Sequence, residues 1–268
     1  MKLQPQQLTG DFGTVGYFQI DGNGRPLLMF HASGAGNASL LRLAGMISDR
    51  TGRPIRSVAL DGYPGTTIRD GATALDRHIA TVHATLDDVE GPADLFGHSL
   101  GGFTVLNVAK AAGQRVASVT AVEPVAVNAL REHSEDAEAL EVDDGPVSRI
   151  APRMAAGKPE EAIRDFIEVW NGVSWDAMPK GARAAILGFA PQILEDTNAI
   201  RYAGGFANDY RIIGCPVHLI GTGRSPITAR AIIRRLHAAN PDWKVTMIDQ
   251  AGHMGPIEQP DLFAPLIG

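Results

Sequence analysis

One serine stands in a sequence pattern that is typical of enzyme nucleophiles. Ser99 lies between Gly97 and Gly101 in Gly-His-Ser-Leu-Gly, after an apolar run at 92–96 and before a stretch of helix formers at 100–112. A strand, a sharp turn and a helix are therefore expected to meet at Ser99, and glycine at both flanking positions leaves room for such a turn. The N–H groups at the start of the helix would face the serine hydroxyl. The pattern predicts a serine nucleophile beside an oxyanion site.

A serine hydroxyl is a weak nucleophile at neutral pH, so it needs a general base within hydrogen-bond distance. Among the eight histidines, His253 is the best candidate, because it follows the last strand-like run in a loop between Gly252 and Gly255. Folds that carry the nucleophile in a strand–turn–helix place the histidine late in the chain, after the serine. We expect His253 to take the proton from Ser99.

A carboxylate usually orients such a base. The loop after the strand-like run at 216–221 is one place where an aspartate is expected, but it holds Ser225 and no acid. Glu123 directly follows another apolar run, and its longer side chain suits reach from that nearer strand. Glu123 is therefore the favoured acid. Asp249 and Asp61 are weaker alternatives, and Asp61 is expected to order its own loop.

An oxyanion that forms during acyl transfer needs two N–H donors. The first candidate is the backbone amide of Leu100, at the head of the predicted helix. The second is expected from the loop of small residues at 32–36, where Gly34 and Gly36 let the backbone approach closely. Within this loop Ser33 is the first choice and Ala32 the second.

Strand-like and helical stretches alternate along the first and last parts of the chain. This alternation predicts an α/β fold, with a mostly parallel sheet and helices on both of its faces. In such sheets ligands bind at the carboxyl ends of the strands, where Ser99, Glu123 and His253 fall. The expected strands are at 14–20, 26–31, 55–60, 92–96, 116–122, 215–221 and 244–248.

The alternation stops between residues 125 and 206, where the chain is mostly helical and lacks strand-like runs. We predict that this segment is a helical cap over the carboxyl edge of the sheet, and that 1–124 and 207–268 form the core. The aromatic residues of the cap are candidates for the lining of a substrate pocket, although such residues more often pack the cap itself. The substrate-binding candidates are Trp170, Trp175 and Phe166.

Composition limits the partners of this chain of 268 residues. Its net charge is −6 and it has no basic stripe, so nucleic acid is not an expected partner. The single cysteine fits a reducing compartment, and neither a signal peptide nor an apolar segment long enough for a membrane is recognised. No histidine has metal-ligand spacing. We expect a cytoplasmic monomer or homodimer that binds a small-molecule substrate without a metal or cofactor.

Taken together, the motifs resemble the α/β-hydrolase family. They are His31-Ala-Ser-Gly for the oxyanion loop, Gly97-His-Ser-Leu-Gly for the nucleophile turn, Glu123-Pro124, and Gly252-His253. The chain is most similar to cap-bearing bacterial serine hydrolases with a glutamate after the sixth strand, and the resemblance implies an eight-stranded sheet. Two departures stand out, because the usual His-Gly is His-Ala here and the usual aspartate is replaced at Ser225.

The resemblance implies hydrolysis of a carboxylic ester or thioester of a small apolar molecule, through an acyl-enzyme on Ser99. One alternative is hydrolysis of a carbon–carbon bond in a diketone-type compound, since the loop at 31–36 is similar to the oxyanion loop of such enzymes. Another is a non-catalytic small-molecule receptor of the same fold, because some members keep the serine, histidine and acid yet act by binding.

Overall fold

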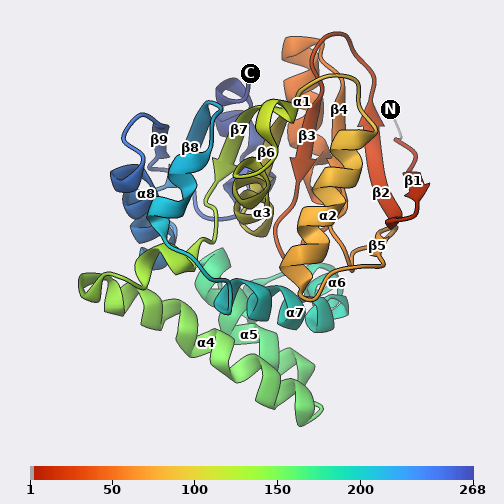
Figure 1. Cartoon of the computed structure of the whole chain (residues 1–268). Helices are drawn as coiled ribbons and strands as arrows, with labels where there is room; N and C mark the ends of the chain where they lie inside the picture. Colours follow the sequence, from red (N-terminus) through yellow and green to blue (C-terminus); the bar gives the residue numbers. More distant parts are fainter. Residues whose placement is uncertain (1–2) are drawn as a thin grey trace.

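A single sheet crosses the molecule in the computed structural model, which describes residues 3–268 (Figure 1). The strands lie in the order β1-β2-β4-β3-β6-β7-β8-β9, and β5 pairs with β2. Pairings from β4 through β9 are parallel, whereas β2 is antiparallel to β1, β4 and β5. The strands are β1 Gln6–Gly10, β2 Gly13–Ile20, β3 Leu27–Phe30, β4 Ile55–Val58, β5 Thr67–Ile68, β6 Ala93–His98, β7 Val116–Val122, β8 Val217–Thr222 and β9 Lys244–Ile248.

The predicted α/β class with a mostly parallel sheet is confirmed, but the predicted count of eight strands is wrong. The described residues form a sheet of nine. The two strands that the apolar runs did not indicate are β1, an edge strand with exposed polar residues, and β5, which has two residues. Edge strands and very short strands bury little surface, so they leave no apolar run in the sequence.

Helices cover both faces of the sheet, and the alternating side chains of β3 divide the core between them. Leu28 and Phe30 pack into a cluster with side chains of α2, α3 and α8, whereas Leu27 and Met29 pack into a second cluster with α1 and α10. This division follows from the two-residue period of a strand. The helices of the core are α1 Leu41–Thr51, α2 Ala74–Asp87, α3 Leu100–Ala109, α8 Ile227–Ala239, α9 Gly255–Glu258 and α10 Pro260–Phe263.

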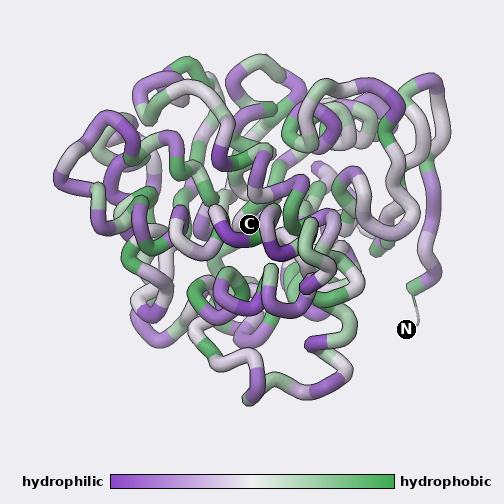
Figure 2. The backbone as a smooth tube through the Cα atoms, turned by 90° about the horizontal axis from the view of Figure 1, so that it is seen from below, coloured by the Kyte–Doolittle hydropathy of each residue, from purple (hydrophilic) through white to green (hydrophobic). Residues whose placement is uncertain are grey.

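Four helices between β7 and β8 lie together at the carboxyl end of the parallel strands, below the sheet in Figure 1. They are α4 Ala137–Ala155, α5 Pro159–Asn171, α6 Lys180–Gly188 and α7 Ala190–Arg201. We refer to residues 125–206, which contain them, as the cap segment. It has a hydrophobic cluster of its own around Ile163, Ile167 and Ile193. Viewed from this end, hydrophilic and hydrophobic stretches alternate along the trace (Figure 2).

Short 3₁₀ turns complete the connections between these elements. They cover Asn37–Leu40, Gly113–Arg115, Val127–Leu130, Ser134–Asp136, Trp175–Ala177, Ala207–Ile212 and Ala264–Leu266. Among residues 3–268, none of the helices has the length and apolar character that a membrane span requires.

Candidate active site

Ser99 occupies a strained turn between β6 and α3. Its backbone has a φ of 56° and a ψ of −114°, in a region that L-residues rarely adopt. The turn requires its two glycines, because a Cβ on Gly97 would lie 2.3 Å from the Gly101 carbonyl oxygen, and one on Gly101 would lie 2.2 Å from the Phe30 oxygen. The Ser99 amide donates to the Val122 carbonyl over 2.9 Å. Ser99 is thereby fixed at the carboxyl edge of the sheet.

Three side chains that are distant in sequence form a hydrogen-bonded chain at this edge. Ser99 Oγ lies 3.0 Å from His253 Nε2, and His253 Nδ1 lies 2.9 Å from Glu123 Oε2. All three side chains are buried. With its proton on Nδ1, His253 donates to the Glu123 carboxylate, and Nε2 is free to accept the proton of the serine hydroxyl. This is the arrangement that makes a serine nucleophilic.

Glu123 is held by donors that no sequence pattern indicates. Its Oε1 accepts from the Thr222 amide at 2.7 Å and from the Thr222 hydroxyl at 3.0 Å, and its Oε2 accepts from Ser225 Oγ at 2.5 Å. Several donors stabilise the charged form of a buried carboxylate. The position at which an aspartate is usual is therefore occupied by Ser225, which binds the carboxylate supplied by the neighbouring strand.

The two weaker acid candidates lie elsewhere. Asp61 accepts from the Ile68 amide and from Arg77 Nε, both at 2.7 Å, so it orders its own loop. Asp249 is exposed. Neither carboxylate is bonded to His253.

Two further buried histidines fix the loops on either side of Ser99. His98 Nε2 donates to the His253 carbonyl over 2.8 Å. His31 donates from Nδ1 to the Ala32 carbonyl at 2.8 Å and accepts the Leu60 amide at Nε2 over 3.0 Å. Burial lowers the pKa of His31 to about 4 and that of His98 to about 3. Both rings therefore stay neutral near pH 7, which the donor and acceptor roles of His31 require.

These two histidines make the protein sensitive to acid. In the unfolded chain each binds a proton near pH 6.5, whereas in the folded protein it does so only near pH 4 for His31 or pH 3 for His98. Unfolding therefore takes up protons below pH 6.5, and each histidine lowers the free energy of unfolding by about 1.4 kcal/mol per pH unit as pH falls. Urea denaturation at several pH values between 4 and 7 gives the free energy of unfolding at each pH, and hence this slope. We expect His98→Asn to reduce the slope by about 1.4 kcal/mol per pH unit, which corresponds to one proton. A slope equal to that of the unaltered protein would contradict the assignment.

The candidate oxyanion donors meet beside Ser99. Ala32, Ser33 and Leu100 all line the pocket at the serine, and among the described residues their backbone amides have no hydrogen-bond partner. The neighbouring amides are engaged, since Gly34 donates to Tyr63 Oη at 2.7 Å and Gly101 to the His31 carbonyl at 3.1 Å. These bonds orient the backbone on both sides of the free amides.

A buried carboxylate of the cap segment holds the loop that carries Ser33. Asp196 on α7 accepts from Ser33 Oγ at 2.6 Å and from Tyr63 Oη at 2.7 Å. It also accepts from His78 Nε2 at 3.0 Å and Gln192 Nε2 at 2.8 Å. Burial acts to raise the pKa of Asp196, but the bonds from these donors keep it below its usual value. Asp196 thereby ties α7 to α2 and to the candidate oxyanion loop.

Replacing Asp196 with alanine removes the shared acceptor of four donors, of which Tyr63 and His78 are buried. Removing one partner from a buried charged network typically costs about 3–5 kcal/mol, so we expect a loss of this size in the free energy of unfolding, measured by urea denaturation. Asp176→Ala is the matched control, because Asp176 also belongs to the cap segment but forms only exposed ion pairs with Arg164 and Arg183. Equal losses for both variants would show that the buried network contributes no more to the free energy of unfolding than exposed ion pairs do.

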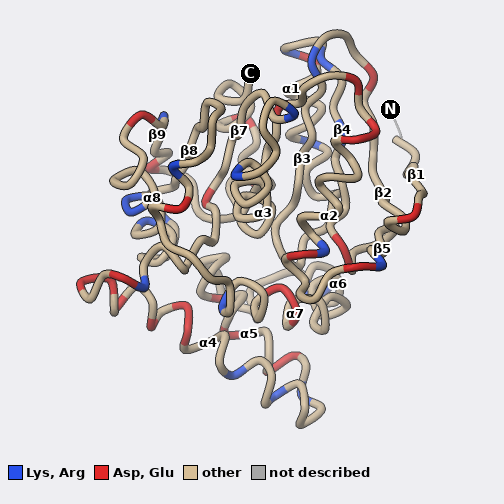
Figure 3. Tube along the Cα trace, in the orientation of Figure 1, with Lys and Arg blue, Asp and Glu red and all other residues tan. Residues whose placement is uncertain are grey.

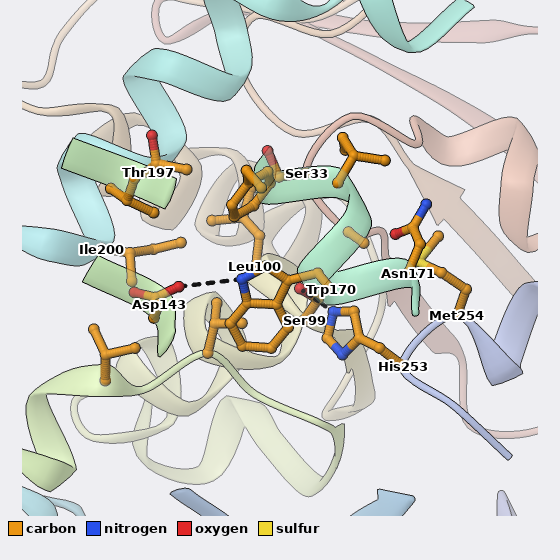
Figure 4. A pocket seen from close by; sticks show the side chains of 16 residues that line it. Ser33, Ser99, Leu100, Asp143, Trp170, Asn171, Thr197, Ile200, His253 and Met254 are labelled. Atoms are coloured by element: carbon orange, nitrogen blue, oxygen red, sulfur yellow. Dashed lines mark hydrogen bonds between the residues drawn. The ribbon is translucent and has the colours of Figure 1, made fainter. Parts of the chain in front are cut away.

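The pocket beside Ser99 is formed mainly by apolar side chains of the cap segment (Figure 4). Trp170 and Phe166 line it, and the ring of Trp170 lies 4.7 Å from that of His253. Trp175 is not part of the lining. It is buried in the hydrophobic cluster of the cap segment and donates from Nε1 to Glu160 over 3.1 Å. The other lining residues are Ala32, Ser33, Ser99, Leu100, Val125, Val127, Asp143, Val147, Ile167, Asn171, Thr197, Ile200, His253 and Met254.

Solved structures share this fold at low sequence identity. A bromoperoxidase from Bacillus anthracis is 17% identical, with a TM-score of 0.77 over 98% of this chain and 98% of that one. An esterase from Thermogutta terrifontis is 20% identical, with a TM-score of 0.69 over 98% and 96%. For an E-2-(acetamidomethylene)succinate hydrolase the values are 16%, 0.72, 99% and 97%.

Sequence comparison gives the family. A search of curated protein sequences finds no significant match. The model described as "Alpha/beta hydrolase family" matches residues 27–266, a range that begins at β3 and includes every side chain of the site described above. The chain therefore belongs to the α/β-hydrolase family and is a hydrolase.

Proposed function

We propose that the protein is a cofactor-free serine hydrolase that cleaves a carboxylic ester or thioester of a small apolar molecule. The observation that carries the proposal is the hydrogen-bonded chain from Ser99 through His253 to Glu123, at the edge of an apolar pocket. A nucleophile, a base and an orienting carboxylate within hydrogen-bond distance are the parts that acyl transfer needs.

Acylation begins when Ser99 Oγ attacks the carbonyl carbon while His253 Nε2 takes the hydroxyl proton. The carbonyl oxygen becomes an oxyanion, which the Leu100 amide and the Ser33 amide, or that of Ala32, stabilise. His253 then gives its proton to the leaving alcohol or thiol as the carbon–oxygen or carbon–sulfur bond breaks. Glu123 keeps Nδ1 protonated and stabilises the imidazolium that forms between these two steps.

Deacylation repeats these steps with water. His253 takes a proton from a water molecule, the resulting nucleophile attacks the acyl carbon, and the bond to Ser99 Oγ breaks as the serine regains its proton. The carboxylic acid then leaves. Apart from the substrate and one water molecule, every group in these steps belongs to the chain.

The size and lining of the pocket support a small apolar substrate. The space open to the centre of a water molecule is about 40 Å³, whereas a single water needs roughly 10–15 Å³ by the same measure. Such a cavity suits a short chain and not a long lipid. Phe166, Ile167 and Trp170 supply apolar contacts for it.

An active-serine probe and a substrate panel test the proposal. We expect a fluorophosphonate to label the protein on the peptide that contains Ser99, as identified by mass spectrometry, and short-chain p-nitrophenyl esters and thioesters to be hydrolysed. The Ser99→Ala variant is the control for both measurements. Faster cleavage of a vinylogous diketone than of any ester would favour the carbon–carbon hydrolase. Binding of small molecules without labelling or turnover would instead indicate a receptor.

A further inference from the structure

A carboxylate in the pocket is not used by the proposed mechanism. Asp143 on α4 is half-buried and lines the same cavity as Ser99. Its Oδ1 accepts from Trp170 Nε1 at 3.1 Å, and the indole lies between Asp143 and His253 in Figure 4. Asp143 is therefore separated from the reacting groups by the width of one aromatic ring, within reach of a substrate bound at Ser99.

No basic side chain in the described part of the chain contacts the Asp143 carboxylate. Within residues 3–268 it forms no salt bridge, and its Oδ2 has no hydrogen-bond partner. Its immediate neighbour behaves differently, because Asp144 points to Arg201 and pairs with it at 3.1 Å. Arg131 donates to the carbonyl oxygens of Ala203 and Arg201. The nearest arginines are thus engaged elsewhere, and Asp143 faces a cavity that is lined mainly by apolar side chains.

An unpaired carboxylate in such surroundings is costly to keep charged. Burial raises the pKa of Asp143 to about 6, although Trp170 and the more distant arginines act in the opposite direction. At pH 8 the group is ionised, and its half-buried position still limits its contact with water. A ligand that brings a positive charge recovers the lost solvation, whereas a purely apolar ligand leaves the carboxylate worse solvated than before.

We infer that Asp143 binds a protonated amine of the substrate, so that the ester or thioester cleaved at Ser99 carries a short apolar chain ending in an alkylammonium group. This inference rests on the proposed hydrolase function. Trp170 supports it in two ways, since its N–H fixes one carboxylate oxygen and leaves the other free, and since aromatic faces attract cations. The acidic residues in the first half of α4, the half that carries Asp143, favour the approach of a cation over that of an anion (Figure 3).

Substrate pairs that differ only at the chain end test the inference. The panel contains methyl esters of unbranched ω-amino acids and acetates of ω-amino alcohols, each over several chain lengths. For every compound there is a matched ester in which methyl, or hydroxyl, replaces the ammonium group. A hydrogen bond to a charged group typically changes an equilibrium constant by about 10–100-fold. We expect kcat/KM at pH 8 to favour the ammonium ester by this factor at one chain length.

Asp143→Asn separates charge recognition from positioning of the indole. The asparagine oxygen still accepts the Trp170 N–H, but the negative charge is lost. We expect the ratio of kcat/KM between ammonium and methyl esters to fall at least about tenfold, and the ratio cancels any effect transmitted through Trp170 to His253. Glu141→Gln is the matched control, because it removes an exposed charge from the same helix and is expected to leave the ratio unchanged. An unchanged ratio in Asp143→Asn, or equal preference for hydroxyl and ammonium esters, would overturn the inference.

A binding experiment separates this inference from the proposed reaction. Hexylammonium and hexanol are titrated by calorimetry into the Ser99→Ala variant, with and without Asp143→Asn. We expect hexylammonium to bind more tightly than hexanol in the Ser99→Ala variant, and to lose this preference when Asp143→Asn is added. If no ester is hydrolysed while this preference persists, the proposed function fails and the amine site stands. If esters are hydrolysed but the two ligands bind equally in both variants, the amine site fails alone.

Discussion

Replacing Ser99 with alanine is expected to lower kcat for ester hydrolysis by about 10⁶-fold. The change removes only Oγ, the atom that lies 3.0 Å from His253 Nε2, so no acyl-enzyme can form. The residual rate reflects only substrate binding and the oxyanion donors. Steady-state kinetics with the best ester of the panel, together with the loss of fluorophosphonate labelling, measure the effect.

The fold of the Ser99→Ala variant should be unaffected, because the substitution leaves the turn and its glycines in place. Its urea unfolding midpoint is therefore expected to match that of the unaltered protein. Ser148→Ala is the matched control, since Ser148 is exposed on α4 and its hydroxyl bonds only to the Gly145 carbonyl. Turnover by Ser99→Ala at the unaltered rate would exclude Ser99 as the nucleophile.

Changing Glu123 to glutamine is expected to lower kcat by about 10³–10⁴-fold. The amide has nearly the same shape, but it cannot balance the imidazolium charge on His253, and its NH₂ group would face donors that now point at Oε1 or Oε2. The loss should appear in kcat more than in KM, because the substrate does not touch residue 123. Asp249→Asn is the control and is expected to change kcat little, since Asp249 is exposed.

A second acid position offers a rescue of the Glu123→Gln variant. Ser225 Oγ lies 2.5 Å from Glu123 Oε2, the oxygen that accepts the hydrogen bond from His253 Nδ1. An aspartate at position 225 would therefore bring its charge close to the same ring nitrogen. We expect Glu123→Gln combined with Ser225→Asp to regain at least part of the lost kcat. In the otherwise unaltered protein, Ser225→Asp would place two carboxylates in contact and lower activity. Failure of the rescue together with an active Glu123→Gln variant would remove Glu123 from the mechanism.

Local sequence patterns were sufficient to predict which strand ends meet. The turn at Ser99 depends on glycines two residues away on either side, and the apolar runs before Ser99 and Glu123 belong to neighbouring parallel strands, β6 and β7. His253 follows the last strand, whose carboxyl end lies at the same edge of the sheet. These features are properties of single segments and of a sheet with few possible topologies, so they can be read before the chain is folded.

Contacts between distant segments of the chain leave no local pattern in the sequence. The bond from Ser225 to Glu123 joins two loops about a hundred residues apart, and Asp196 reaches Ser33 across an even longer interval. No sequence pattern indicates either contact. Trp170 and Trp175 show the same limit, because both are tryptophans near the end of α5, yet one lines the pocket and the other is buried within the cap segment. Only the packing of the helices distinguishes them.

Selection for heat resistance would act against turnover at Ser99. Backbone conformations as unusual as the one at this serine cost about 1–3 kcal/mol, and glycine avoids that cost. Glu123 also has a positive φ, of 45°, but replacing it with glycine would leave the donors of Thr222 and Ser225 without an acceptor. A library screened only for folded protein would thus drift to glycine at position 99 and keep glutamate at 123. Thermostable variants of this hydrolase must therefore be chosen with residue 99 held constant, or with activity measured in every round.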